Sequence, residues 1–208
     1  MRNDHYPLGT VQNILQTDFV LPQTKEVLQQ RLNTPVVIEP SFFTKEEFVT
    51  LQVLCNCLLP QPSDRKNEID TAGIFDTNSK EGKTGNGWRY DSMPPDATAY
   101  KQGLQAIEQS AQSQYGKAFQ HLEERQQHKL ITAVQEGTVD NDLWKNIPSQ
   151  LFFKEIFSLL AEIYFSHPVG KEEIGEVSFA DAKGWHNIQL NEREIQEPEI
   201  INENMQPR

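Results

Sequence analysis

The sequence predicts an all-α protein: a single domain of about five to seven helices with an extended, irregular C-terminal tail. Three observations support this fold class. A capping-box pattern runs from Thr44 to Glu47 and opens an amphipathic stretch. Residues 97–115 repeat apolar side chains at helical spacing. Residues 151–165 are apolar around more than half of a helix circumference.

The N-terminal part is expected to contain one short helix. Residues 1–22 are interrupted by glycine and proline, which favour irregular structure. Residues 24–32 then place apolar side chains on one helix face, with Thr24 as a plausible N-cap. An extended link follows between Pro35 and Pro40.

The strongest helix signal begins at Thr44. The apolar residues that recur at helical spacing after it are Phe48, Leu51, Cys55, Leu58 and Leu59. Pro60 ends this helix. Residues 63–84 are polar, so we expect only a short, weakly defined helix there around Phe75.

Two further helices are predicted to form an antiparallel hairpin. Asp96 is placed to cap a helix over residues 97–115, and Gly116 fits a turn after it. A second helix is predicted for residues 119–136, because apolar side chains recur along it until Gly137.

The broad apolar helix after Pro148 ends before Pro168, and such helices usually lie at the centre of a core. Residues 170–208 carry nine acidic against four basic side chains and show no sustained apolar period. We therefore expect three parts. These are an N-terminal irregular segment with a short helix (1–40), a helical core (41–169), and an extended acidic tail packed on the core or on a partner (170–208).

Charge excludes several functions. The formal net charge of −11 over 208 residues argues against nucleic-acid binding and against adhesion to an anionic membrane surface. No apolar run approaches the roughly 18 residues of a membrane-spanning helix.

Cys55 and Cys57 point to different sides of a helix, so neither a mutual disulfide nor a zinc site is expected.

One irregular loop stands out by its composition. Trp88, Arg89, Tyr90 and Met93 lie between glycines and a double proline, which prevent regular structure. The loop is either pinned to the domain's own helices or offers a docking surface, since Trp, Tyr and Arg are enriched at interfaces. We take these four residues, supported by Trp185, as candidate partner-binding residues.

Two groups of side chains are weighed for chemistry of their own. His121, Glu124 and His128 share one helix face, but a single helix supplies no further ligands, so no metal site is expected.

The second group begins with His167, which lies at a helix end with acidic residues close behind. It either caps the helix or, with Glu173 and His186, serves acid–base catalysis on a carbohydrate. Our first interpretation assigns no catalytic residue to the chain, and a free-standing carbohydrate-active enzyme is the alternative.

The chain contains no glycine-rich dinucleotide fingerprint, no P-loop and no nucleophile elbow. We therefore expect no cofactor in this chain. If the protein takes part in redox chemistry, another chain carries the cofactor.

Several short motifs follow one another between residues 40 and 200. They are Phe42–Phe43 through Pro60, Gly87–Asp96, Tyr100–Leu104, Tyr115–Phe119, Gln126–Gln127, Phe152–Phe153, Tyr164–Pro168, Glu173–Gly175 and Lys183–Trp185. Together they resemble the gluconate 2-dehydrogenase subunit 3 family.

The resemblance implies a small, mostly helical accessory subunit without a cofactor. Its partner would be a large FAD-containing dehydrogenase of the glucose–methanol–choline type, which oxidises sugars or sugar acids and passes electrons to a cytochrome c or another acceptor. The family's small subunit often carries a twin-arginine signal and assists export. No such pair occurs in the first 20 residues here. We expect a cytoplasmic protein if the chain is complete, or a periplasmic one exported with its partner.

Overall fold

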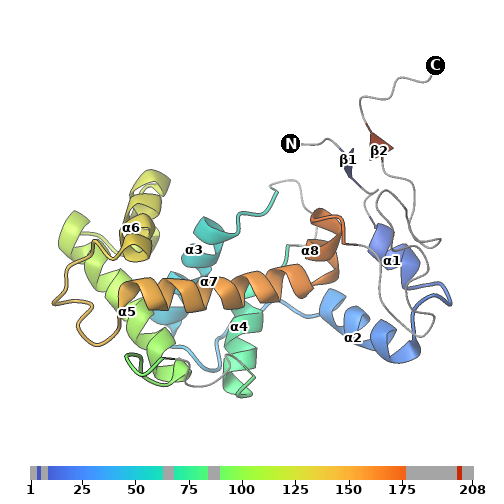
Figure 1. The fold of residues 1–208 in the computed structure, drawn as a ribbon, viewed down its shortest axis with the longest axis horizontal. Coiled ribbons are helices and arrows are strands. Elements are labelled where there is room, and N and C mark those ends of the chain that lie inside the picture. Colours follow the sequence, from blue (N-terminus) through green and yellow to red (C-terminus); the bar gives the residue numbers. More distant parts are fainter. Residues whose placement is uncertain (1–3, 6–8, 63–67, 84–89, 177–200, 203–208) are drawn as a thin grey trace. The chain divides into compact units, whose positions relative to one another are not determined.

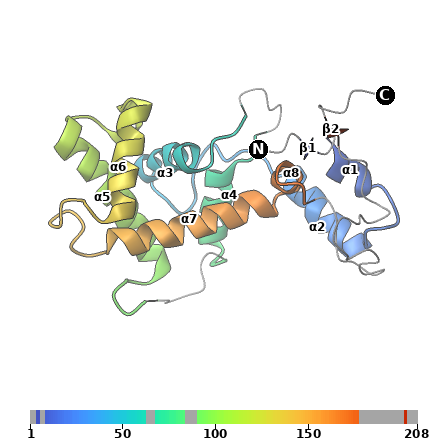
Figure 2. The same ribbon diagram turned by 45° about the horizontal axis from the view of Figure 1, so that its top comes forward.

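The computed structural model describes residues 4–5, 9–62, 68–83, 90–176 and 201–202. Within these residues the chain forms eight α-helices, one short 3-10 helix and one pair of two-residue strands (Figures 1 and 2). The all-α prediction is confirmed, and the helix number exceeds the expected range because short helices occur near both ends.

The chain divides into two compact units instead of a central core with two appendages. Unit 1 combines residues 1–35 with residues 165–208, and unit 2 is the continuous stretch 36–164.

Unit 2 is built around α3. Its elements are α3 (Lys45–Leu58), α4 (Thr71–Lys80), α5 (Asp96–Tyr115), the 3-10 helix η1 (Phe119–His121), α6 (Glu124–Glu136) and α7 (Ser149–Ser166) up to Tyr164. Helix α3 contacts α4, α5, η1 and α6. Helix α7 also contributes to the core of unit 2, as the sequence predicts, through the buried side chains of Phe152, Ile156 and Leu160. One flank of α7 stays accessible, because Phe157 remains 39% exposed.

The beginning of α3 is the capping box that the sequence predicts. The Thr44 hydroxyl accepts the Glu47 N–H at 3.2 Å, and the Glu47 carboxylate accepts the Thr44 N–H at 3.0 Å. Two backbone donors that helix geometry leaves free are thereby satisfied. Behind this cap, Phe48, Leu51 and Leu54 are buried in the core of unit 2.

Helix α4 is better defined than its sequence predicts, because two aspartates anchor it. Asp70 caps its start by accepting the Gly73 N–H at 2.9 Å. Asp76 is 0% exposed and accepts the backbone N–H groups of Ser41 (2.7 Å), Phe42 (3.0 Å) and Phe43 (2.9 Å), together with the Ser41 hydroxyl (2.9 Å). Burial alone would raise the pKa of Asp76, but these four hydrogen bonds together lower it below its ordinary value.

The single helix expected over residues 119–136 is broken in two. Leu122 and Glu123 adopt extended backbone angles between η1 and α6. The break has a local cause: Glu123 and Gln126 form a second capping box, so a new helix begins at Glu124. Gly137 takes the left-handed conformation (φ 72°) and ends α6 as predicted. Helices α5 and α6 pack against each other (Figures 1 and 2).

Helices α5 and α7 approach closely at one glycine. An added Cβ on Gly103 would overlap the ring of Phe152. Phe152 is fully buried in the core of unit 2. A residue without a side chain is therefore required at position 103.

Unit 1 joins the two ends of the chain. It contains β1 (Asp4–His5), α1 (Thr10–Ile14), α2 (Pro22–Leu32), α8 (Pro168–Glu173) and β2 (Ile201–Asn202). Asp4 pairs with Asn202 and His5 with Ile201 in an antiparallel ladder. A small apolar core is formed by Val11, Ile14, Leu15, Val20 and Leu28.

Three expectations for unit 1 are corrected. Residues 1–22 are not wholly irregular, because α1 forms within them once its first N–H groups are satisfied by Glu172, which accepts from Gly9 at 2.8 Å and Val11 at 3.1 Å. Helix α2 begins at Pro22 and not at Thr24, since proline suits the first helical position. The region after residue 170 is not wholly extended either, because it completes α8 and supplies β2.

Candidate functional site

A groove of about 500 Å³ lies between α3 and α5, and we call it the α3–α5 groove. Leu104 (1% exposed) is at its bottom, and Val49 and Ala118 add further apolar surface. Two further carboxylates line it: Glu46 is exposed and Glu108 is half-buried. The groove therefore has an apolar floor and a rim that carries carboxylates.

One wall of the α3–α5 groove is held by a hydrogen bond between a buried glutamate and an exposed glutamine. The Glu47 carboxylate accepts the amide N–H of Gln105 at 2.9 Å, while its other oxygen caps α3. Glu47 is 7% exposed and Gln105 is exposed, so this hydrogen bond links α3 to α5 at the surface of the groove. Glu108 accepts the Phe119 N–H at 3.1 Å with Oε2. Its Oε1 forms no hydrogen bond with the residues that the structure describes.

The only cation that lines the α3–α5 groove within the described chain points elsewhere. Lys45 Nζ pairs with Glu39 at 2.9 Å, and Glu39 is not part of the groove. The hydrogen bond and the charge of Glu39 raise the pKa of Lys45, and the charge of Glu46 adds a smaller contribution. The groove lining thus carries the three carboxylates of Glu46, Glu47 and Glu108 against the one ammonium group of Lys45.

The sequence does not reveal this groove. Its key contact joins Glu47 to Gln105, two residues that are 58 positions apart. Neither residue belongs to a recognisable motif. The abundance of glutamate and glutamine on both helices is the only signal, and solvated helix faces share it.

The candidate partner-binding loop is anchored to unit 2 at its C-terminal end. Met93 is 6% exposed and belongs to the core, and Tyr90 packs against that core with Lys154 Nζ 5.7 Å from its ring centre. Trp88, Arg89 and Trp185 lie outside the described residues. Tyr90 and Met93 are thus primarily contacts within the domain.

Helix α7 carries an aromatic pair that the sequence analysis did not single out. The rings of Phe153 and Phe157 are stacked, with centres 5.8 Å apart and planes 9° apart. In the same unit Val36 and Ile38 are 67% and 86% exposed, while Val37 between them packs against the core. The N–H of Val37 donates to Asp70 at 2.7 Å, and this hydrogen bond helps to keep Val37 packed inward between its two exposed neighbours.

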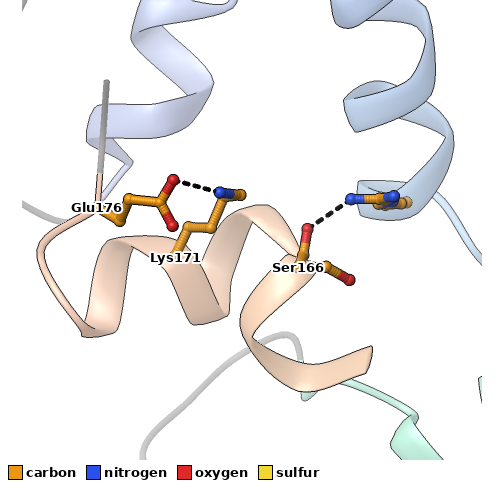
Figure 3. A network of polar contacts seen from close by, with 4 residues as sticks. Ser166, Lys171 and Glu176 are labelled. Atoms are coloured by element: carbon orange, nitrogen blue, oxygen red, sulfur yellow. Dashed lines mark hydrogen bonds and ion pairs between the residues drawn. The ribbon is translucent and has the colours of Figure 1, made fainter. Parts of the chain in front are cut away.

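His167 is a buried structural residue in unit 1. It caps α8: Nδ1 accepts the Val169 N–H at 3.2 Å, so a neutral ring carries its proton on Nε2 and donates to the Arg31 carbonyl at 3.0 Å. The Arg31 guanidinium in turn donates to the Ser166 carbonyl at 2.7 Å. Figure 3 shows the hydrogen bond to the Ser166 carbonyl together with the Lys171–Glu176 ion pair of 2.6 Å.

Two of the three residues of the alternative catalytic set lie within the described residues. His167 is 7% exposed and both ring nitrogens take part in the contacts just described. Glu173 lies exposed near the end of α8, and His186 lies outside the described residues. His167 thus caps a helix, but it caps the start of α8 and not, as the sequence suggested, the end of the preceding core helix.

His121, Glu124 and His128 are all exposed on η1 and α6. The part of the chain that the structure describes contains no group of three or more His, Cys, Asp or Glu side chains that could hold a metal ion. Within the same residues no helix combines the length and apolar character needed to cross a membrane.

The two cysteines are free thiols. Burial raises the pKa of Cys55, with smaller contributions from Asp70 and Cys57. Burial and the nearby charge of Glu124 raise the pKa of Cys57 to about 11. Neither thiol has the low pKa that a catalytic cysteine requires.

These features define a small all-helical protein whose most prominent described surfaces are a polar groove and exposed apolar side chains. A family model described as gluconate 2-dehydrogenase subunit 3 matches residues 45–188, which is more than half of the chain. The chain belongs to this family, as the order of its motifs predicts. No curated protein matches the chain, and no solved structure matches it.

Proposed function

We propose that this chain is a non-catalytic small subunit. It binds and stabilises the large subunit of a flavin-dependent sugar or sugar-acid dehydrogenase and assists its maturation or export. The observation that carries the proposal is the family match over residues 45–188, which covers the whole of α3 to α8. The name of that family describes one subunit of a dehydrogenase assembly.

The chemistry is assigned to the partner. The chain has no dinucleotide-binding motif, so the FAD belongs to a large subunit of the glucose–methanol–choline type. Electrons then pass from that subunit to a cytochrome c or another acceptor. The small subunit shares the compartment of its large subunit, whether periplasm or cytoplasm.

Exposed apolar surface on unit 2 supports a role in binding. Phe157, stacked on Phe153, and the side chains of Val36 and Ile38 are accessible on a protein whose formal net charge is −11. Aromatic and aliphatic groups of this kind anchor protein interfaces. In the loop before α5, contact with the partner is assigned to Trp88 and Arg89, with Trp185 in support, because Met93 is buried.

The proposal is tested by mild affinity purification of the chain from its native cell, followed by an absorption spectrum of the eluate. A larger, yellow, co-eluting protein with flavin bands is the expected result. A single colourless chain at every salt concentration would contradict the proposal, and its activity on carbohydrates would then be measured.

The contact residues are tested in the same assay. Trp88→Ala with Arg89→Ala, and separately Phe157→Ala, should reduce the recovered large subunit while the circular dichroism of the chain stays unchanged. Glu162→Gln, on the same helix as Phe157, serves as the control and should leave recovery unchanged. Loss of helicity in the Trp88/Arg89 variant would show instead that the loop stabilises its own domain.

A further inference from the structure

The α3–α5 groove combines features that a merely solvated helix face does not need. A hydrogen bond between Glu47 and Gln105 links the two helices, and the buried Leu104 lines a hollow of about 500 Å³. This volume suits one or two amino-acid side chains and the backbone that connects them. The groove is formed wholly within unit 2.

The carboxylate oxygens at the rim can accept further hydrogen bonds. Glu108 uses Oε2 for the Phe119 N–H, and its Oε1 has no hydrogen-bond partner among the described residues. The Glu46 carboxylate likewise makes no hydrogen bond within the described chain. A ligand that fits must therefore donate hydrogen bonds, and a cationic donor gains most from a carboxylate.

We propose that the α3–α5 groove binds a basic segment of the partner polypeptide, with an Arg or Lys side chain between Glu46 and Glu108 and an adjacent apolar side chain on Leu104. The inference rests on the proposed function, because it assigns the occupant to the large subunit. Arginine suits the rim best, since its planar guanidinium can contact two carboxylates at once.

Charge complementarity points to another molecule and not to this chain. A second copy would bring a further net charge of −11. The segment after residue 170 carries nine acidic and four basic side chains, so its electrostatic match to a carboxylate rim is poor. A basic segment from a different polypeptide relieves the repulsion among Glu46, Glu47 and Glu108.

The first test uses the full-length ¹⁵N-labelled chain and a capped hexapeptide of alternating leucine and arginine as the probe. Its addition should shift backbone amide signals of α3 and α5, and raising the salt concentration from 50 to 300 mM should weaken binding at least threefold. The matched control peptide has glutamate in place of arginine and should cause no shifts. Equal shifts from both peptides, or shifts confined to other helices, would overturn the proposal.

Two variants locate the rim. Glu46→Gln removes a charge that has no hydrogen-bonding role in the described structure. Glu108→Gln keeps an oxygen that can accept the Phe119 N–H. Each should weaken binding of the probe at least fivefold with unchanged thermal unfolding. Glu136→Gln on α6 removes the same charge outside the groove and should have no effect. Equal weakening by all three variants would mean nonspecific attraction and would contradict a site.

The final arm separates this inference from the proposed function. Purification of the Glu46→Gln/Glu108→Gln chain from the native cell should recover at least fivefold less flavoprotein than the unaltered chain does. Full recovery would overturn the groove proposal and leave the accessory-subunit role intact. If the unaltered chain captures no flavoprotein while the basic probe still binds, the proposed function fails and the partner assigned to the groove fails with it.

Discussion

The N–H of Phe43 donates to Oδ1 of Asp76 over 2.9 Å, so a buried carboxylate on α4 fixes the chain just before α3 begins. The hydrogen bonds from Ser41 and Phe42 complete the same arrangement. One side chain thus sets both the start of the central helix and the position of α4 beside it.

Replacement of Asp76 by Asn should destabilise the protein by about 2 kcal/mol, because the amide nitrogen cannot accept a hydrogen bond and leaves a buried donor unsatisfied. Urea unfolding at pH 7 measures the effect. Asp142→Asn, at an exposed position, is the control and should change stability by less than about 0.5 kcal/mol. If the Asp76→Asn variant has the same free energy of unfolding as the unaltered chain, these hydrogen bonds are not needed for stability.

The same carboxylate predicts a pH dependence. Its pKa is lower in the folded protein than the ordinary value of 3.8, so its ionised form stabilises the fold above that pH. This contribution disappears as the pH falls through the lowered folded-state pKa. The stability difference between the unaltered chain and Asp76→Asn should therefore shrink steadily below pH 4. A difference that stays constant down to pH 2 would contradict the assignment.

Gly103→Ala should destabilise the protein by about 1–3 kcal/mol, because the new methyl group overlaps the ring of Phe152. The direction of this change in stability is informative, since alanine usually stabilises a helix relative to glycine by about 1 kcal/mol. Ser113→Ala in the same helix is the exposed control. In the double variant with Phe152→Leu, the loss should be smaller than the sum of the single losses; simple additivity would argue against the contact.

Glu172→Gln should loosen the beginning of α1. The amide retains one acceptor for the two N–H groups of Gly9 and Val11, and it removes a negative charge from the helix start. Hydrogen exchange of the Val11 amide should accelerate about fivefold, for a loss of about 1 kcal/mol. The exchange of Leu51 in α3 should not change, and equal acceleration at both amides would indicate general destabilisation.

Cys57 should react slowly with thiol reagents. Its pKa of about 11 reduces the thiolate fraction at pH 8 by about a hundredfold relative to the ordinary value of 9.0. The reaction rate, followed by mass spectrometry of the modified peptide, should rise about tenfold per pH unit between pH 7 and 10. A plateau near pH 9 would contradict the raised pKa. Glu124→Gln should increase the rate modestly, since that charge is the smaller of the two causes.

Local signals explain which elements the sequence predicts well. The capping box at Thr44 and the glycine ends at Gly116 and Gly137 depend on residues a few positions apart, and all three form as expected. The sequence also contains the Glu123–Gln126 box that divides the helix predicted over 119–136, and the apolar period simply masked it.

Long-range contacts explain what the sequence leaves open. Helix α4 is anchored to residues more than thirty positions earlier through Asp76, and α1 depends on Glu172 at the other end of the chain. The α3–α5 groove arises from the pairing of Glu47 with Gln105. No pattern within one segment encodes these contacts. The family resemblance could still be found in the sequence, because it depends on the order of many weak motifs along the chain.

The contact between Gly9 and Glu172 spans 163 positions, and this separation has a consequence during synthesis. At about 5–20 residues per second, a ribosome needs roughly 8 to 33 s to make the intervening chain. Unit 2 is continuous and can fold on the emerging polypeptide, whereas the N–H groups of Gly9 and Val11 lack their Glu172 acceptor until the end of the chain has been made. The start of α1 is thus without this stabilising contact for most of translation.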